Sequence, residues 1–232
     1  MKQLNLITVL AIFLLSLSNV NGQSKVIKLN FKKGEVLDIL LFTGKPDMGK
    51  YFPEYKKTAF AFALQTGYTP QPILNITETT EGGLQPGNFV FGKWKNLTAR
   101  EQFLNEIDKK VPDFHQQRRK MWSTFYLSYF EMNENTSFEL HSEKLNVATA
   151  YWLKNKNDIK NFQKEWTKMA KKNGATILLG LNNPKSSVGY MYKPNFIILT
   201  SWPSKASFDN FKKEAFLKKN KSVINVNEFI IK

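Results

Sequence analysis

The chain has 232 residues, contains no cysteine and carries a formal net charge of +15 at pH 7. The lack of cysteine excludes disulfide bridges, thiolate nucleophiles and cysteine-bound metal clusters, so the core alone has to stabilise the fold. The positive charge suits an anionic ligand or a polyanionic surface, although scattered lysines are also typical of an ordinary solvated surface.

The first 22 residues have the pattern of a secretory signal peptide. Lys2 precedes an apolar run over residues 4–17, and a short polar stretch ends at Gly22. The run is shorter than the roughly 20 apolar residues that a membrane span needs. We therefore expect cleavage after Gly22, a mature chain that does not span a membrane, and a periplasmic or extracellular location.

An N-terminal extension, residues 23–34, is followed by a first repeat over residues 35–132. Strands are predicted over residues 36–43, 73–79, 88–94 and 124–132. One helix is expected to end at Gly67, because glycine adopts the left-handed conformation at a helix end without a Cβ clash. A second helix is expected to begin at Thr98, which has the spacing of a capping box with Glu101.

A polar linker, residues 133–143, leads to a second repeat over residues 144–232. Strands are predicted over residues 146–153, 176–181, 195–202 and 229–231. Between them we expect a helix from about residue 158 that ends at Gly174, and another that begins near Ser204 as its N-cap. Aromatic residues such as Trp166 recur along the first of these helices at three- and four-residue steps, which favours packing on a sheet.

The two repeats therefore share the order β-α-β-β-α-β. Each also contains a tryptophan followed nine residues later by a phenylalanine: Trp94 and Phe103, then Trp202 and Phe211. This order is that of a ferredoxin-like unit, whose sheet has helices on one face only. Two such sheets can cover each other's open face. The predicted fold class is α+β, with two ferredoxin-like repeats packed sheet to sheet as an intrachain α/β barrel, and these aromatic residues should hold helices to sheet.

The segment FIILTSWPSKASFDNF, residues 196–211, joins a strand ending in tryptophan to a polar turn and a helix with an early aromatic residue. This pattern resembles the dimeric α/β-barrel superfamily, most clearly over residues 174–219 and more weakly over residues 36–132. The resemblance implies relatives that include cofactor-independent monooxygenases, haem-dependent enzymes, muconolactone-type isomerases and proteins of no known activity. No catalytic motif of these relatives matches, so no catalytic residue is carried over.

Three strand residues are candidates for a ligand site between the sheets. Asp38 interrupts an apolar strand, where burial would raise the pKa of its carboxyl and make it a proton acceptor; alternatively it lies at a solvent-exposed strand end. Tyr126 and Trp152 lie in strands that should border the inter-sheet space. Aromatic rings with a few polar tips are typical of small-molecule pockets and equally of an ordinary core.

Two further candidates lie outside the strands. Tyr190 belongs to a long loop, residues 182–193, expected either to act as a flap over the cavity or to be a plain insertion. His141 precedes the first strand of the second repeat, where it would reach a cavity mouth or remain a surface residue. Neither His141 nor His115 has a second ligand at metal spacing, so no metal site is predicted.

These observations leave the function as ranked hypotheses. The first is an exported, non-catalytic protein, monomeric or homodimeric, that binds a small anionic or aromatic ligand between its sheets. The second, implied by the resemblance, is a cofactor-independent monooxygenase or a haem-dependent enzyme. The third is a basic module for polyanionic surfaces. Whether the protein is an enzyme stays open, no cofactor is predicted from the residues although the resemblance leaves haem open, and no nucleic-acid partner is expected.

Overall fold

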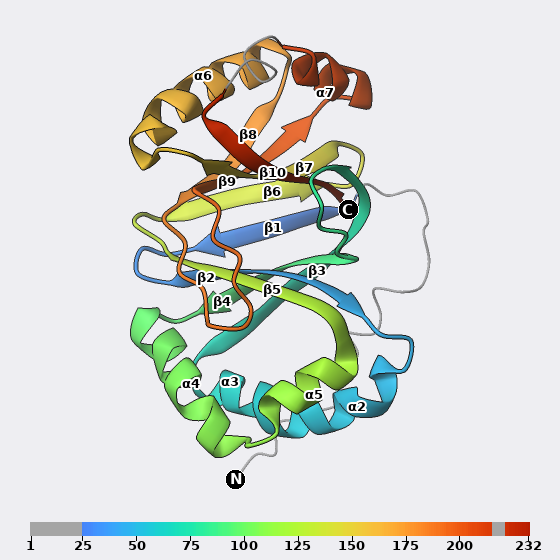
Figure 1. Ribbon diagram of the computed structural model, residues 1–232, viewed down its shortest axis with the longest axis vertical. Helices are drawn as coiled ribbons and strands as arrows, with labels where there is room; N and C mark the ends of the chain where they lie inside the picture. Colours follow the sequence, from blue (N-terminus) through green and yellow to red (C-terminus); the bar gives the residue numbers. More distant parts are fainter. Residues whose placement is uncertain (1–24, 215–220) are drawn as a thin grey trace.

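The computed structural model describes residues 25–214 and 221–232 (Figure 1). The first repeat comprises β2 (Val36–Gly44), α2 (Met48–Tyr55), the π-helical turn η2 (Lys56–Phe60), α3 (Ala61–Gln65), β3 (Tyr68–Glu81), β4 (Asn88–Trp94), α4 (Leu97–Lys110), α5 (Phe114–Met121) and β5 (Trp122–Glu131). The second comprises β7 (Leu145–Leu153), η3 (Lys156–Asp158), α6 (Ile159–Lys172), β8 (Thr176–Asn182), β9 (Phe196–Trp202), α7 (Lys205–Lys212) and β10 (Val223–Ile231). The expected signal peptide, residues 1–22, lies outside the described residues. Within the described ranges, no helix combines the length and the apolar character needed to cross a membrane.

Each repeat forms a four-stranded antiparallel sheet with the strand order of a ferredoxin-like unit. The order is β5-β2-β4-β3 in the first repeat and β10-β7-β9-β8 in the second. In both, the first and third strands of the repeat lie between its fourth and second strands. β3 also pairs with β10, which joins the two sheets along one seam into eight strands. The predicted fold class is thereby confirmed.

The helices cover the outer faces of the two sheets. Figure 1 shows the sheets face to face in the middle of the molecule, with α2 to α5 at one end and α6 and α7 at the other. Trp94 and Phe103 are buried between the first sheet and its helices with ring centroids 5.1 Å apart, and Trp202 and Phe211 make the same contact at 5.0 Å. Their predicted role in holding helices to sheet is confirmed.

A two-stranded ribbon is formed by two segments of the chain that belong to neither repeat. It consists of β1 (Val26–Phe31) and β6 (Thr136–His141), which pair antiparallel. The sequence predicted an N-terminal extension over residues 23–34 and a linker over residues 133–143, and the structure places one strand in each. The two strands are short and more than a hundred residues apart in the chain, so their pairing is a tertiary contact that local pattern does not reveal.

The helix ends follow the predicted chemistry with one correction. Helix α4 begins at Leu97, directly after its N-cap Asn96, whose side-chain oxygen accepts a hydrogen bond of 2.8 Å from the backbone N–H three residues on. The predicted capping box at Thr98 is therefore wrong, because the side chain of Asn96, two residues earlier in the chain, accepts the hydrogen bond from the first turn. Ser204 caps α7 as predicted, and Gly67 and Gly174 adopt positive φ of 101° and 87° at helix ends.

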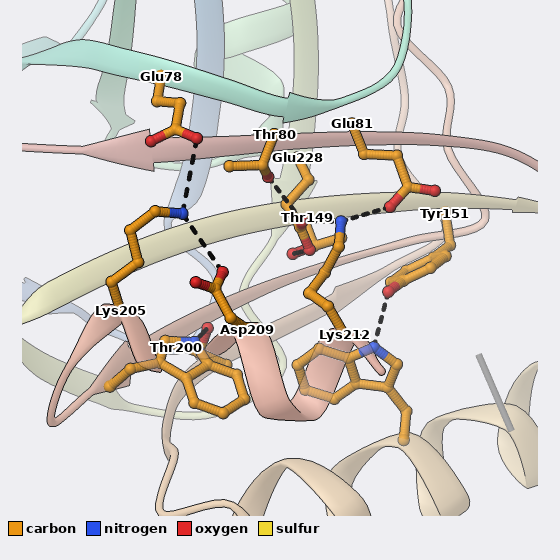
Figure 2. A network of polar contacts seen from close by, with 12 residues as sticks. Glu78, Thr80, Glu81, Thr149, Tyr151, Thr200, Lys205, Asp209, Lys212 and Glu228 are labelled. Atoms are coloured by element: carbon orange, nitrogen blue, oxygen red, sulfur yellow. Dashed lines mark hydrogen bonds and ion pairs between the residues drawn. The ribbon is translucent and has the colours of Figure 1, made fainter. Parts of the chain in front are cut away.

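A polar network fixes the seam between the repeats (Figure 2). The carboxylate of Glu228 on β10, only 1% exposed, accepts hydrogen bonds from Thr80 at 2.7 Å and Thr149 at 3.0 Å. Lys212 on α7 contacts Glu228 and Glu81 at 2.6 Å each. Burial alone would lower the pKa of Lys212, but the two carboxylates outweigh it and raise the pKa above its ordinary value. Because Thr80 and Glu81 belong to β3, the network ties the second repeat to the first.

Candidate functional site

Apolar side chains fill most of the space between the two sheets. The β1–β6 ribbon contributes Leu29, Phe31, Phe138 and Leu140 to this core, and Phe138 lies edge-on to Phe91 of β4 at 5.7 Å. Further along, the space lined by residues such as Phe89 and Phe229 has no room for a water-sized sphere. A ligand site running through the whole inter-sheet space is therefore excluded by packing.

A pocket of about 330 Å³ that is open to solvent, here called the cavity, remains at the end of the inter-sheet space away from the ribbon. Its position follows from the strands: Met132, just after β5, accepts a hydrogen bond from Gly34 beside the ribbon, whereas Tyr126 lies six residues earlier, in the first half of β5. The lining comes from five segments of the chain and consists of Gly83, Leu84, Tyr126, Trp152, Met191, Tyr192, Asn225 and Asn227. Two of the five predicted site residues, Tyr126 and Trp152, are thus brought together here.

Three aromatic rings form the apolar part of this cavity. The ring of Tyr192 lies edge-on to Trp152 at 5.3 Å and tilted against Tyr126 at 6.4 Å. Burial raises the pKa of the Tyr192 phenol above its ordinary value of 10.0, more than the hydrogen bond from Asn227 lowers it. The phenol therefore stays protonated at neutral pH and can serve as a hydrogen-bond donor.

Two asparagines on β10 form the polar part. Asn227 is buried, and its Oδ1 atom has no hydrogen-bond partner among the described residues. Asn225, two residues earlier on the same face of the strand, is exposed at the rim. A buried amide oxygen without a hydrogen-bond partner is costly, and this one packs against Gly82. The accessible polar group is the amide of Asn225 at the rim.

The segment 183–193, here called the strap, closes the barrel along β5. Backbone hydrogen bonds of 2.8 to 2.9 Å join Lys185 to Tyr129 in both directions and Leu127 to the carbonyl oxygen of Tyr190. Ser128 donates its hydroxyl to the carbonyl oxygen of Tyr192. The long loop considered as a flap is therefore bonded to the edge of β5 and forms part of the barrel wall.

Tyr190 points away from the cavity, contrary to prediction. Its hydroxyl lies 2.6 Å from Nδ1 of His115, and its ring packs against Phe125 at 5.2 Å and under the Arg118 guanidinium at 4.8 Å. The reason is that the strap wraps around the edge of β5. Tyr190 thus lies on the outer face with Phe125, while Tyr192 lies on the inner face.

Asp38 also lies on the outer, helix-covered face and not beside the cavity. It is 2% exposed and accepts hydrogen bonds from Nε1 of Trp94 at 2.9 Å and Nε of Arg100 at 3.0 Å. Burial raises the pKa of Asp38, against the lowering influence of Arg100 and Trp94. Strand alternation explains the placement, because the neighbouring Leu37 and Ile39 occupy the inner face.

His141 is the last residue of β6 in the ribbon, far along the strands from the cavity. It is half-buried and lies 3.5 Å from a carboxylate oxygen of Glu139 and 3.3 Å from one of Glu143. Within the described ranges no cluster of three or more His, Asp or Glu side chains could hold a metal ion. His115 is on the outer face with Tyr190, so neither imidazole lines the cavity, and the lining does not fit a histidine-bound haem.

The two asparagines and Met191 were not predicted as site residues, and Tyr190 was predicted in place of Tyr192. The signal for the asparagines was present: Asn225, Asn227, Phe229 and Ile231 alternate along one face of β10. The predicted strand began only at Phe229, which left the asparagines outside it. The choice between Tyr190 and Tyr192 depends on how the strap meets β5, which no local pattern reports.

No family model matches the chain, and no curated protein matches it in sequence. Among solved structures, an anthrone oxidase-like protein superposes with a TM-score of 0.45 at 13% identity, over 88% of this chain and 94% of that chain. A mutant chlorite dismutase from Candidatus Nitrospira defluvii superposes with a TM-score of 0.47 at 9% identity, over 86% and 92%. Both TM-scores lie below 0.5, so the fold assignment rests on the strand order and register of this chain.

Proposed function

We propose that the protein binds a small, uncharged aromatic molecule in the cavity at the strap end of the barrel. The observation that carries this proposal is the lining itself. Three rings, Tyr126, Trp152 and Tyr192, line an open pocket of about 330 Å³, and the exposed amide of Asn225 lies at its rim. Apolar walls with a few placed polar groups are typical of small-molecule sites.

The lining favours an uncharged ligand over an anionic one. None of its residues carries a charged side chain, although the chain as a whole is strongly basic. An ion in such a site would give up part of its hydration without gaining a counter-charge. Phenol and amide groups instead suit a hydroxyl, carbonyl or amide on the ligand.

The same lining favours binding over acid–base catalysis. A general base at neutral pH is most often an imidazole or a carboxylate, and the cavity wall contains neither. The Tyr192 phenol, with its raised pKa, is a donor and not a proton acceptor. A binding role uses the phenol and amide groups of the wall and needs no general base.

Fluorescence titration tests the binding proposal. The probe is N-phenyl-1-naphthylamine, which is uncharged and aromatic, and 8-anilinonaphthalene-1-sulfonate is its anionic counterpart. We expect the uncharged probe to bind more tightly, and Trp152→Ala and Tyr126→Ala each to weaken it by about tenfold through lost ring contacts. Tyr51→Ala, a half-buried aromatic on α2, is the matched control and should leave binding unchanged. Equal binding by the Trp152→Ala variant and the unmodified protein would overturn the proposal.

We also propose that the protein is exported, on the strength of the basic, apolar and polar segments of residues 1–22. Expression in a host with a secretory pathway, followed by N-terminal sequencing, checks this. A mature protein that begins at Gln23 is expected, and a chain that retains Met1 in the cytoplasm would contradict it.

A further inference from the structure

Helix α6 carries a regular row of exposed lysines on the face opposite the sheet. Its apolar side buries Phe162, Trp166 and Ala170 against the second sheet. Four lysines, all exposed, follow one another at four-residue steps on the other side: Lys160, Lys164, Lys168 and Lys172. This row is here called the lysine ladder, and the exposed Lys171 lies beside its end.

The ladder is almost free of acidic partners. Within the described residues, the one carboxylate at ion-pair distance from it is that of Glu214, 3.4 Å from Lys172. The single acidic residue inside α6 is Glu165, which is half-buried. Like charges four residues apart destabilise a helix, so three consecutive lysine pairs weaken α6. Helix stability therefore does not explain why lysine recurs at these positions.

The position of the ladder makes it available to a partner. Figure 1 shows α6 in the outermost layer at one end of the molecule, on the far side of the second sheet from the inter-sheet space. A rise of 1.5 Å per residue separates successive lysines by roughly 6 Å along the axis, so the ladder is about 18 Å long. A partner on this face would leave the cavity untouched.

We propose that the lysine ladder of α6 docks the protein on a surface of anionic lipid headgroups. A row of charges on a convex helix matches a flat array of anions, and four to eight basic residues on an amphipathic helix are typical of electrostatic binding to anionic membranes. Sites for single-stranded nucleic acid interleave basic residues with exposed aromatic rings. The exposed residues of α6 are lysines and Asn161, without an aromatic side chain among them.

Vesicle sedimentation tests this proposal with the chain that lacks residues 1–22, which retains every described element. The vesicles contain equimolar phosphatidylglycerol and phosphatidylcholine, and vesicles of phosphatidylcholine alone serve as the neutral comparison. We expect binding to the anionic vesicles only, with loss as salt concentration rises. Lys164→Glu/Lys168→Glu should weaken the partition by at least tenfold.

The matched control is Lys50→Glu/Lys57→Glu, which makes the same charge change in the helical layer at the other end of the molecule. It should keep most of the binding, and circular dichroism should show both variants folded. Equal loss in both variants would show that net charge and not the ladder is responsible, and would overturn the proposal. Absence of binding to anionic vesicles, or tight binding to a single-stranded oligonucleotide in its place, would overturn it as well. Because the cavity takes no part in membrane binding, the outcome of this experiment does not depend on the outcome of the naphthylamine titration.

Discussion

Trp94 and Trp202 occupy equivalent places in the two repeats, but the side chains that surround them differ in chemistry. The strand register pairs Val36 with Trp94 in the first repeat and Leu145 with Trp202 in the second. Counting from these pairs, Asp38 of the first repeat is matched by Val147 of the second. In the same way Arg100, six residues after Trp94, is matched by Phe208, six residues after Trp202.

The two tryptophans also find different hydrogen-bond acceptors. The indole N–H of Trp94 donates to Asp38, which in turn pairs with Arg100, whose guanidinium lies 5.0 Å from the Trp94 ring. The indole N–H of Trp202 donates to Thr200, two residues earlier on its own strand, at 2.9 Å. All these side chains are buried, so one core position is satisfied by an ion pair in one repeat and by apolar packing in the other.

A glycine explains the difference. The residue two positions before Trp94 is Gly92, where an added Cβ would lie 2.9 Å from the Tyr68 ring and 3.1 Å from the Cβ of Asp38. The first repeat therefore has no room for the threonine that the second repeat uses. Its indole needs an acceptor from the neighbouring strand, and a buried carboxylate there needs Arg100 to balance its charge. Asp38 is therefore a consequence of packing and does not belong to the cavity lining.

Removal of Arg100 should have the largest effect. We expect Arg100→Leu to lower the free energy of unfolding by about 3–5 kcal/mol at neutral pH, because it leaves the Asp38 charge buried and unpaired. Burial already raises the pKa of Asp38, and loss of the guanidinium raises it further. A carboxyl with a raised pKa in the folded state destabilises the fold when ionised, so the deficit should shrink as the pH falls toward the ordinary value of 3.8.

Urea unfolding at neutral pH and near pH 5 measures this deficit. The equivalent change in the second repeat, Phe208→Leu, is the control and should cost less and show no such pH dependence. A deficit for Arg100→Leu that is equal at both pH values would contradict the assignment of the penalty to Asp38.

The buried carboxylate of the second repeat, Glu228, lies at the seam instead. Removal of its charged partner should lower the free energy of unfolding less than Arg100→Leu does. We expect Lys212→Met to lower the free energy of unfolding by about 2–3 kcal/mol, since Glu228 keeps its hydrogen bonds from Thr80 and Thr149. Lys213→Met, at the exposed neighbouring position, should change it by less than about 0.5 kcal/mol. The effects of Lys212→Met and Arg100→Leu should add, because the two sites share no partner. Chemical denaturation of the double variant tests the additivity.

Replacing the ion pair of the first repeat by the apolar residues found at the equivalent positions of the second should recover most of the stability that Arg100→Leu loses. The double variant Asp38→Val/Arg100→Phe removes both charges, so the buried-charge penalty disappears. We expect it to remain about 1–2 kcal/mol below the unmodified protein, because the Trp94 N–H loses its acceptor and Gly92 supplies none. Thermal unfolding should place it above Arg100→Leu. A double variant less stable than Arg100→Leu would mean that the two repeats are not interchangeable at this position.

The smallest effect should come from Thr200. Thr200→Val keeps the shape of the side chain but removes the acceptor of the Trp202 N–H, which should cost about 1 kcal/mol. Thr176→Val, on an exposed position of the neighbouring strand, provides the matched control and should be close to neutral. If both changes were neutral in urea unfolding, the indole hydrogen bond would not be what distinguishes the repeats.

The repeat and its consequences could be predicted from local sequence patterns. Alternation and helical periodicity predicted the β-α-β-β-α-β order twice, and the spacing of Trp94 and Trp202 to their phenylalanines predicted which rings hold helices to sheet. Glycine at residues 67 and 174 predicted helix ends for a stereochemical reason that needs no tertiary context. These features depend on residues close in the chain, so local pattern suffices. The signal peptide stays a prediction.

The positions of the polar groups depended on contacts between segments that are distant in the chain. Tyr126 and Trp152 could be placed by alternation, but Tyr190 and Tyr192 fall on opposite faces of β5 because the strap wraps around the edge of that strand. The β1–β6 ribbon, paired across more than a hundred residues, fills the space in which a larger site was expected and leaves the cavity at one end. Whether a side chain faces a cavity, a helix or solvent depends on contacts between distant segments, and those contacts are a property of the assembled fold.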